Sequence, residues 1–362
     1  MPAASVAVSL KGKLIYQRAF GYRDLERKTN LQPNQPFRAA SLSRILTVVA
    51  ALQLVDRGKL KLNQSVYQML DVKPWKEDSV DERSRDITVL NLLQETAGHD
   101  QRATFDPGLI PTRIARRMGL NKGTLAPDEL MQYMLSQSLT YTPGSKSKTS
   151  SYGYFLLGRV IEKASGQPYE KYVMENIAEP IGLSSLTMSR TDPAQRSKQE
   201  VKNVQRAGAY YPKIAGDDAG QWVLFNEGGI NFDLLDASHG WMISPSDMLN
   251  LMTAIQASPS SLLSDDAKVL LIAKPDYFLA RKDPGRVWKA CSLFCRKTNN
   301  GITFWRHTQD LNCCAGLVCF STSGLSYCFM FNTQNTAAGE NPKDFFDGLL
   351  NRESNRVRRS IE

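Results

Sequence analysis

Strand-forming segments lie near both ends of this 362-residue chain, and a mostly helical stretch separates them. Residues 5–22 alternate apolar and polar side chains on either side of Lys11-Gly12-Lys13, a pattern typical of a β-hairpin. Three further segments rich in apolar and aromatic residues, ITFWRHT, AGLVCFSTSG and SYCFMFN, occupy residues 302–332. We therefore expect one antiparallel sheet built from both termini, with the helical stretch inserted beside it.

The inserted stretch carries helical periodicity and helix boundary signals. After Ser43, apolar residues recur at helical spacing up to Val55, and Gly58 supplies a stop signal. The other expected helices are VLNLLQ, residues 127–137, two over residues 152–181, one opened by the capping box at Ser244-Pro245-Ser246-Asp247, and a closing amphipathic helix, KDFFDGLLNRES. Residues 200–240 indicate loops and short strands. The expected fold class is α/β in the α+β sense, with the sheet flanked by helices.

We expect one domain over residues 1–362. Its sheet lobe would comprise about residues 1–40 and 240–350, and its helical lobe about residues 41–239. The chain is long enough for a large core of this kind. Its hydrophobic fraction of 42% and charged fraction of 22% are those of an ordinary globular protein.

The charge pattern argues against a nucleic-acid partner. The net charge of +9 is spread over the sequence, and the basic residues are dense only at Arg352, Arg356, Arg358 and Arg359. Nucleic-acid binding requires a concentrated basic stripe, so we expect a solvated surface instead. No run of about 18 apolar residues occurs, which predicts no transmembrane segment.

The N-terminus and the cysteines bear on the compartment. The opening MPAASVAVSL has no basic start and no clear apolar targeting segment. The chain as it stands is expected in the cytoplasm, and the alternative is an exported protein whose leader is missing.

The cysteine spacing is C-x3-C and then an adjacent pair, with His307 as the nearby histidine, which does not favour zinc. We expect buried thiols in strands, or one or two disulfides in an exported protein, and no metal or organic cofactor. The cysteines are Cys291, Cys295, Cys313, Cys314, Cys319 and Cys328.

Five segments in a particular order indicate a family. They are FRAASLSRILTVVAALQLVDRGKLKLNQSV, LLQETAG, TPGSKSKTSSYGYFLLGRVIEKASGQPYEKYV, HGWMISPSD and WRHTQ. Together they resemble the serine β-lactamase and penicillin-binding-protein superfamily, in its class C or esterase-like branch. The resemblance covers nearly the whole chain and implies a β-lactamase/transpeptidase-like fold.

The resemblance also implies acyl transfer by three elements that meet between the sheet and the helical lobe. The first is S-x-x-K at a helix N-terminus, whose lysine helps to take the proton of the nucleophilic serine. The second is Y-x-N, whose tyrosine acts as base or proton relay. The third is a Lys- or His-led triplet ending in Gly, on a strand that offers a backbone N–H to the oxyanion hole.

The first element reads Ser41-Leu42-Ser43-Arg44 in this chain. The resemblance places Ser41 at the nucleophile position. Arg44 stands where the lysine is expected, and a guanidinium with a pKa above about 12 stays protonated and cannot act as a base. Its planar fork is suited to holding a carboxylate or fixing the loop. The alternative for Ser41 is an ordinary helix N-cap.

The second element reads Thr149-Ser150-Ser151, which lacks both the phenol and the amide of Y-x-N. Thr149 and Ser151 therefore occupy the catalytic positions that the resemblance implies. Lys148 and Tyr152 flank the triplet; they are candidates to replace the missing groups and to bind substrate. A shift of one residue in a loop changes where a side chain points, which weakens both candidates.

The third element reads His307-Thr308-Gln309. A leading His-Thr fits the branch and makes His307 a candidate catalytic residue and Thr308 and Gln309 candidate substrate-binding residues, although His307 alone also fits a structural histidine. Glycine is used where a substrate must approach the backbone closely, so Gln309 is expected to project toward the pocket and partly fill it. In LLQETAG, Glu95 stands where the family often has histidine.

Three functional hypotheses follow. A general base is worth roughly 10²- to 10⁴-fold in rate, so the loss of two predicts a catalytically impaired protein that binds a small-molecule or peptide-like ligand in the cleft, of peptide, ester or amide type. The alternative is an active serine hydrolase or acyltransferase, of esterase, peptidase or β-lactamase type, working through an acyl-enzyme at Ser41 with a substitute base. The third is an interaction protein that never used the pocket. The sequence leaves the substrate and the oligomeric state open.

Overall fold

The computed structural model describes residues 2–334 except 121, 205–209, 215–219, 283–284, 299–300, 312 and 322. The strands are β1 (Ala4–Leu10), β2 (Lys13–Phe20), β3 (Tyr22–Asp24), β4 (Thr29–Asn30), β5 (Phe37–Arg38), β6 (Thr187–Met188), β7 (Tyr210–Pro212), β8 (Trp222–Leu224), β9 (Trp241–Ile243), β10 (Val287–Lys289), β11 (Phe294–Thr298), β12 (Gly301–Asp310), β13 (Cys313–Phe320) and β14 (Leu325–Phe331). The α-helices are α1 (Ser43–Asp56), α2 (Val66–Leu70), α3 (Val89–Leu93), α4 (Pro111–Arg117), α5 (Pro127–Leu135), α6 (Ser151–Ser165), α7 (Tyr169–Val173), α8 (Glu179–Ile181), α9 (Asp236–His239), α10 (Pro245–Gln256), α11 (Asp265–Ile272) and α12 (Asp276–Leu279). A short 3-10 turn, Ala40–Leu42, precedes α1.

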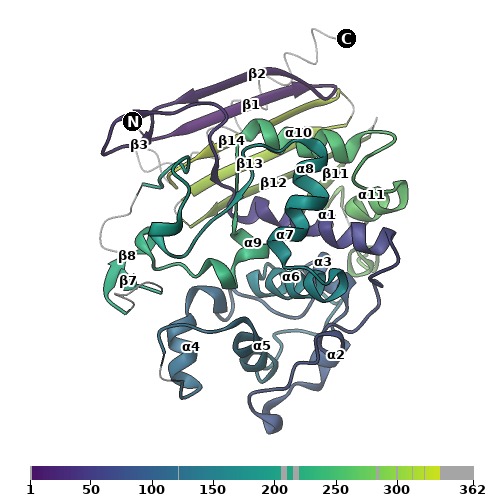
Figure 1. Cartoon of the computed structure of the whole chain (residues 1–362). Coiled ribbons are helices and arrows are strands. Elements are labelled where there is room, and N and C mark those ends of the chain that lie inside the picture. The colour runs from purple at the N-terminus through teal and green to yellow at the C-terminus, as the bar shows by residue number, and fades with distance from the viewer. Residues whose placement is uncertain are drawn as a thin grey trace.

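The main sheet joins the two ends of the chain. It has seven strands in the order β10-β11-β12-β13-β14-β1-β2, and every neighbouring pair is antiparallel. The N-terminal strand β1 pairs with β14, so that Val6 lies opposite Phe329. Figure 1 shows this sheet at the top of the molecule, with the helical region below it. The predicted sheet from both termini is confirmed.

The hairpin between β1 and β2 follows from its turn residues. Lys11 and Gly12 both adopt positive φ, 51° and 79°. Two successive residues at positive φ make the type I′ turn whose twist matches that of the flanking strands. Glycine takes this conformation without the steric penalty that other residues have. The Lys11-Gly12-Lys13 signal therefore predicted the position of the turn correctly.

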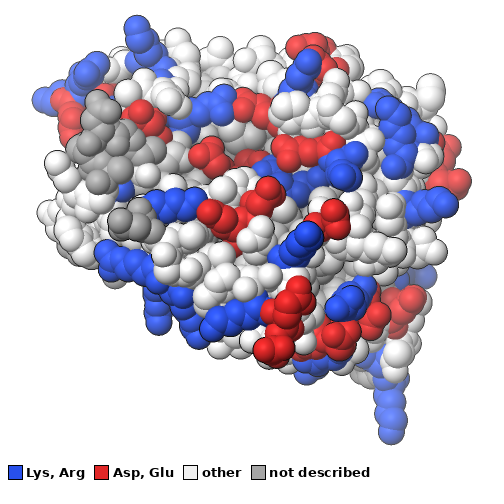
Figure 2. Space-filling view, turned by 60° about the horizontal axis from the view of Figure 1, so that its bottom comes forward, with Lys and Arg blue, Asp and Glu red and all other residues white. Residues whose placement is uncertain are grey.

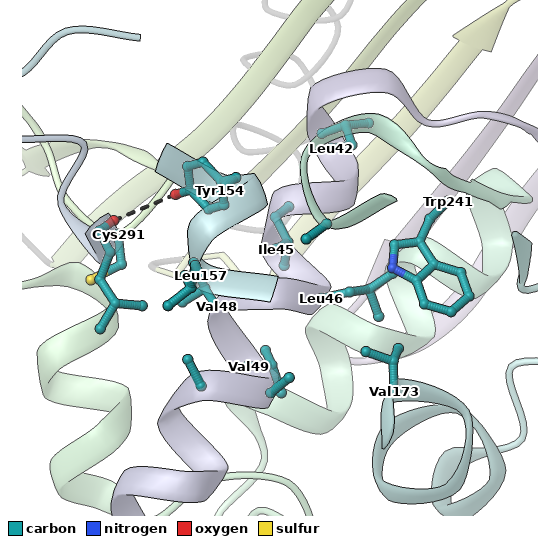
Figure 3. Packing of buried hydrophobic residues seen from close by; sticks show 14 of the residues in the cluster. Leu42, Ile45, Leu46, Val48, Val49, Tyr154, Leu157, Val173, Trp241 and Cys291 are labelled. Atoms are coloured by element: carbon teal, nitrogen blue, oxygen red, sulfur yellow. Dashed lines mark hydrogen bonds between the residues drawn. The ribbon is translucent and has the colours of Figure 1, made fainter. Parts of the chain in front are cut away.

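Helix α1 runs through the centre of the core. Its residues from Ser43 to Leu54 are all buried, as the apolar character of most of its faces predicts. Figure 3 shows Leu46 of α1 close to Trp241 of strand β9 and to Val173 of helix α7. The helix ends before Gly58, which has φ 68°. The first helix prediction is therefore confirmed.

The two faces of the sheet carry different side chains. The larger hydrophobic cluster contains α1 together with residues such as Phe304 and Leu317, on the face that the helices cover. A second cluster, which includes Trp305 and Phe329, lies on the other face. Because side chains alternate along a strand, β12 directs Arg306 and its even-numbered neighbours toward the helices.

Helices of the described part of the chain occur at the predicted places, and Ser244 caps α10 by accepting a hydrogen bond from the Asp247 N–H at 3.2 Å. The expected helix over residues 343–354 lies outside the described residues. All six cysteines are buried free thiols. No described helix is long and apolar enough to cross a bilayer, and acidic and basic side chains intermix on the face shown in Figure 2.

Candidate functional site

Ser41 lies in the 3-10 turn directly before α1. Its neighbour Ala40 adopts φ 43°, in the left-handed region that residues with a Cβ rarely occupy. Ser41 itself is only 4% exposed. The N-cap residue of α1 is Leu42, and no side chain caps the helix. Ser41 therefore does not act as a helix cap, and its hydroxyl engages another part of the molecule.

That partner is Arg306 on β12. Arg306 Nε donates a hydrogen bond to Ser41 Oγ at 3.2 Å, and Nη1 donates to the carbonyl of Ser292. Arg306 is buried and comes from the sheet face that meets the 3-10 turn. Within the described residues, no group accepts a hydrogen bond from the Ser41 hydroxyl. The side chain of Arg306 therefore lies against Ser41, the residue expected at the nucleophile position, where a hydrolase would need a proton acceptor.

Glu95 holds a buried cluster of cations beside Ser41. Its carboxylate is 1% exposed and lies 3.3 Å from Arg44 Nη1 and 3.5 Å from Arg306 Nη1. Lys289 Nζ contacts the other carboxylate oxygen. We call these four residues, Glu95, Arg44, Lys289 and Arg306, the Glu95 cluster. With three cations and one carboxylate, its net charge is +2 when all four are ionised.

The electrostatics of the cluster keep Glu95 ionised. Burial alone would raise the pKa of this carboxyl, but the charges of Lys289, Arg44 and Arg306 lower it to about 2. Burial lowers the pKa of Lys289 below its usual value, while attraction to Glu95 opposes that change. A carboxylate with so low a pKa and three cationic partners is a weak base.

Arg44 and Lys289 connect the cluster to the second motif. Arg44 stacks over the Tyr154 ring at 4.8 Å and donates from Nη2 to Ser151 Oγ at 3.5 Å. Lys289 Nζ lies 3.4 Å from Thr149 Oγ1. Arg44 thus binds a carboxylate, the role that its planar fork suits. The structure brings Ser41, Arg44, Thr149 and Ser151 into one connected set.

Ser151 extends this set toward the surface of the helical lobe. Its hydroxyl donates to Asp106 Oδ2 at 2.5 Å, and its backbone N–H donates to Gln101 Oε1 at 2.6 Å. Both partners come from the loop that follows Glu95 in the sequence. Gln101 and Asp106 therefore hold the N-terminus of α6 next to Arg44.

The two residues that flank the second motif point elsewhere. Lys148 is half-exposed and forms an ion pair with Asp100 at 3.3 Å. Tyr152 is buried, shares a hydrogen bond with the Tyr67 hydroxyl at 2.9 Å and packs edge-on against His99. A shift of one position at the start of a helix turns a side chain by about 100°. Neither residue reaches Ser41.

The third motif also differs from its expected placement. The His307 ring packs on Phe329 at 6.0 Å, and the Gln309 amide donates to the carbonyl of Gln334 at 2.9 Å at the protein surface. Both side chains lie on the sheet face opposite Arg306, because β12 alternates its side chains. Thr308 is buried on the same face as Arg306. The side chain that fills the space at Ser41 is thus Arg306, and this corrects the position expected for Gln309.

Sequence reasoning missed two members of the Glu95 cluster. Arg306 stands inside the quoted WRHTQ segment, and the strand alternation that buries Thr308 also buries Arg306. Lys289 lies on the short strand β10, for which no strand was expected. Arg306 stands two residues before Thr308, so strand alternation places both side chains on the same face of the sheet, and this pattern could have identified Arg306. No comparable pattern in the sequence identifies Lys289.

A cavity of about 260 Å³ opens beside this site, in the helical lobe. Gln101, Ser150 and Tyr152 line it, whereas Ser41 and the members of the Glu95 cluster do not. No group of three or more described His, Cys, Asp or Glu residues is placed to hold a metal ion.

Comparison with known proteins gives consistent matches over the chain. A family model described as Beta-lactamase matches residues 1–338. Protein flp of Staphylococcus aureus (strain MW2) is 23% identical over 259 residues, 72% of this chain and 46% of that protein. Esterase EstB of Burkholderia gladioli is 28% identical over 191 residues, 52% of this chain and 48% of the esterase. The chain thus spans about half the length of the curated relatives it matches.

Solved structures share the fold. The octameric penicillin-binding protein homologue from Pyrococcus abyssi superposes with a TM-score of 0.70 at 20% identity, covering 97% of this chain and 74% of that one. Amidases are among the other solved structures that match. The predicted β-lactamase/transpeptidase-like fold is confirmed.

Proposed function

This chain belongs to the Beta-lactamase family, and we propose that it is a catalytically impaired member that binds a peptide-, ester- or amide-like ligand without turning it over. The observation that carries the proposal is the hydrogen bond from Arg306 Nε to Ser41 Oγ. A cation that donates to the nucleophile position replaces the base that acyl transfer requires.

The chemistry of the neighbouring groups supports impairment. A serine nucleophile is activated by an adjacent group that takes its proton. Arg44 and Arg306 stay protonated at neutral pH and cannot do so. Glu95 has a pKa of about 2 and faces three cations, so it has little tendency to accept a proton. Thr149 supplies a hydroxyl in place of the phenol of Y-x-N.

The retained scaffold supports ligand binding. Relatives of this chain are named as an esterase and as amidases, enzymes of ester and amide substrates. In this chain Ser151 at the start of α6 donates hydrogen bonds to Gln101 and Asp106, and its hydroxyl accepts one from Arg44. Fold alone does not establish function, so the ligand class is a proposal drawn from these relatives.

A labelling experiment tests the catalytic part of the proposal. The protein and its Ser41→Ala variant are incubated with a fluorophosphonate, a penicillin and a chromogenic ester, with intact mass and product release recorded. Esterase EstB serves as the positive control for the ester. We expect neither an adduct nor turnover above the Ser41→Ala background. Labelling at Ser41 with steady product release would overturn the proposal.

The alternative function is an active serine hydrolase or acyltransferase that uses a different base. One observation favours it: Lys289 has a lowered pKa and its Nζ lies 3.4 Å from Thr149 Oγ1, beside the position that resembles the tyrosine of Y-x-N. If this alternative holds, the wild type turns over the chromogenic ester and Lys289→Met abolishes that turnover. If the proposed function holds, neither protein shows turnover in the same assay.

A further inference from the structure

The cavity in the helical lobe has the size of a small-molecule site. Its volume is about 260 Å³, and an apolar cavity of about 150 Å³ is known to hold one benzene. Phe105, Met134 and Tyr152 supply apolar and aromatic walls, and Gln101 and Thr140 supply polar groups. There is room for one six-membered ring that carries a short polar group.

Two polar groups at this cavity have unused hydrogen-bonding capacity. His99 is 8% exposed, and its Nε2 has no hydrogen-bond partner within the described part of the chain. The Gln101 Oε1 is engaged by Ser151, whereas the Gln101 amide nitrogen donates to no described residue. The His99 Nε2 is buried, and a buried polar atom without a partner costs free energy that a correctly placed ligand group recovers. The cavity therefore offers unpaired polar groups beside aromatic walls.

The walls of the cavity select for an uncharged ligand. None of its lining residues carries a formal charge at neutral pH, because burial lowers the pKa of His99 to about 4 and leaves its imidazole neutral. A charged ligand group would lose its hydration without gaining a counter-ion there. A neutral imidazole and a primary amide can together donate to and accept from a carboxamide, and they can donate to the carbonyl oxygen of an ester.

We propose that this cavity binds an uncharged aryl amide or ester, with the ring between Phe105, Met134 and Tyr152 and the polar group at His99 and Gln101. The inference rests on the proposed function, since it gives the location and chemical class of the ligand of that function. It places the ligand at the N-terminus of α6, because Gln101 lines the cavity and also accepts a hydrogen bond from the Ser151 N–H.

A matched pair of probes tests the class of ligand. Phenylacetamide and phenylacetate have the same size and shape and differ in charge. Binding is followed by NMR on protein with 13C-methyl methionine, with the Met134 signal assigned by Met134→Leu. We expect phenylacetamide to shift the Met134 signal in a saturable manner, and phenylacetate to bind at least tenfold more weakly. Equal or tighter binding of phenylacetate, or no saturable shift from phenylacetamide, would overturn the inference.

A pair of surface variants tests the location. Thr140 is an exposed residue at the rim of the cavity, so Thr140→Trp places a large ring there without disturbing the core. Thr142 is also exposed, lies two residues further on and does not line the cavity, so Thr142→Trp is the control. We expect the first variant to weaken phenylacetamide binding at least tenfold and the second to leave it unchanged. Equal effects of the two variants would contradict the proposed site.

The same titration on Ser41→Ala separates this inference from the proposed function. Phenylacetamide should bind this variant with unchanged affinity, because Ser41 does not line the cavity. Adduct formation at Ser41 in the labelling assay would overturn the proposed function and leave these binding data intact. Loss of saturable binding in both proteins would overturn the cavity inference alone.

Discussion

Arg306 Nε lies 3.2 Å from Ser41 Oγ and donates a hydrogen bond to it. The hydroxyl of the expected nucleophile is thus held by a cation from the sheet. If the protein is catalytically impaired, as we propose, restoring acyl transfer requires removal of Arg306 as well as addition of the bases that the motifs lack.

The first prediction concerns restoration of Ser41 reactivity. Arg44→Lys restores the lysine of S-x-x-K, Thr149→Tyr restores the tyrosine of Y-x-N, and Arg306→Ser removes the guanidinium from Ser41. We expect the triple variant to be labelled by a fluorophosphonate at least 100-fold faster than the wild type, since one general base is worth roughly 10²- to 10⁴-fold. The double variant without Arg306→Ser is the control and should remain close to the wild type. Equal labelling of the two variants would show that Arg306 does not block Ser41.

The second prediction concerns the stability that Glu95 provides. Glu95→Gln removes the carboxylate and leaves Arg44, Lys289 and Arg306 buried without it. Removing one partner of a buried ion pair costs about 3–5 kcal/mol, so we expect a loss of this size in the free energy of unfolding, measured by denaturant titration.

Glu82→Gln is the matched control for that measurement. Glu82 pairs with Arg85 at 3.0 Å, but both side chains are mostly exposed, 76% and 68%. A solvated pair of this kind contributes little, and the variant should stay within about 0.5 kcal/mol of the wild type. Equal losses in the two variants would contradict the role assigned to Glu95.

The third prediction is a pH dependence of stability. The folded pKa of Glu95, about 2, lies below its ordinary value of 4.5. The unfolded chain therefore binds the proton more readily, and the stabilisation is fully present above about pH 4.5 and is lost as the pH falls toward 2. Arg44, Arg306 and Lys289 stay protonated in this range, so Glu95 is the titrating group of the cluster.

This pH dependence is measured as a difference between two proteins. The unfolding free energies of the wild type and Glu95→Gln should differ most at neutral pH. The difference should shrink by an amount on the order of 3 kcal/mol as the pH approaches 2, because a protonated Glu95 resembles glutamine. A difference that stays constant between pH 5 and pH 2.5 would contradict the ionised state of Glu95 in the folded protein.

Local signals in the sequence predicted the scaffold better than the site. The turn at Lys11-Gly12-Lys13 and the buried helix that begins at Ser43 depend on neighbouring residues, so periodicity and turn chemistry located them. The position of Lys289 beside Glu95 depends on contacts between residues 194 positions apart. A sequence pattern carries no information about such a contact, and Lys289 was therefore missed.

Arg306 shows how much depends on strand register. The motif His307-Thr308-Gln309 was located correctly on a strand, but which of its side chains meets Ser41 depends on the face that each residue occupies. A register shift of one residue exchanges the two faces. The prediction that Gln309 fills the space at Ser41 was therefore wrong, because Gln309 lies on the other face of the strand and Arg306 contacts Ser41 instead.

The fourth prediction concerns the backbone before Ser41. Ala40 has φ 43° and Ala39 has φ −76°, and both are fully buried. The left-handed conformation costs a residue with a Cβ about 1–2 kcal/mol, and glycine escapes this cost. Ala40→Gly removes this conformational cost, but it also removes one buried methyl group, worth about 0.8 kcal/mol, and adds backbone entropy to the unfolded chain. These effects nearly cancel, so the free energy of unfolding should change by less than about 0.5 kcal/mol.

Ala39→Gly is the control. It loses the methyl group and adds the same backbone entropy without relieving a left-handed conformation, so it should destabilise the protein by about 1–2 kcal/mol. Denaturant titration of the two variants measures the difference, and a larger loss for Ala40→Gly than for Ala39→Gly would contradict the strained conformation at Ala40.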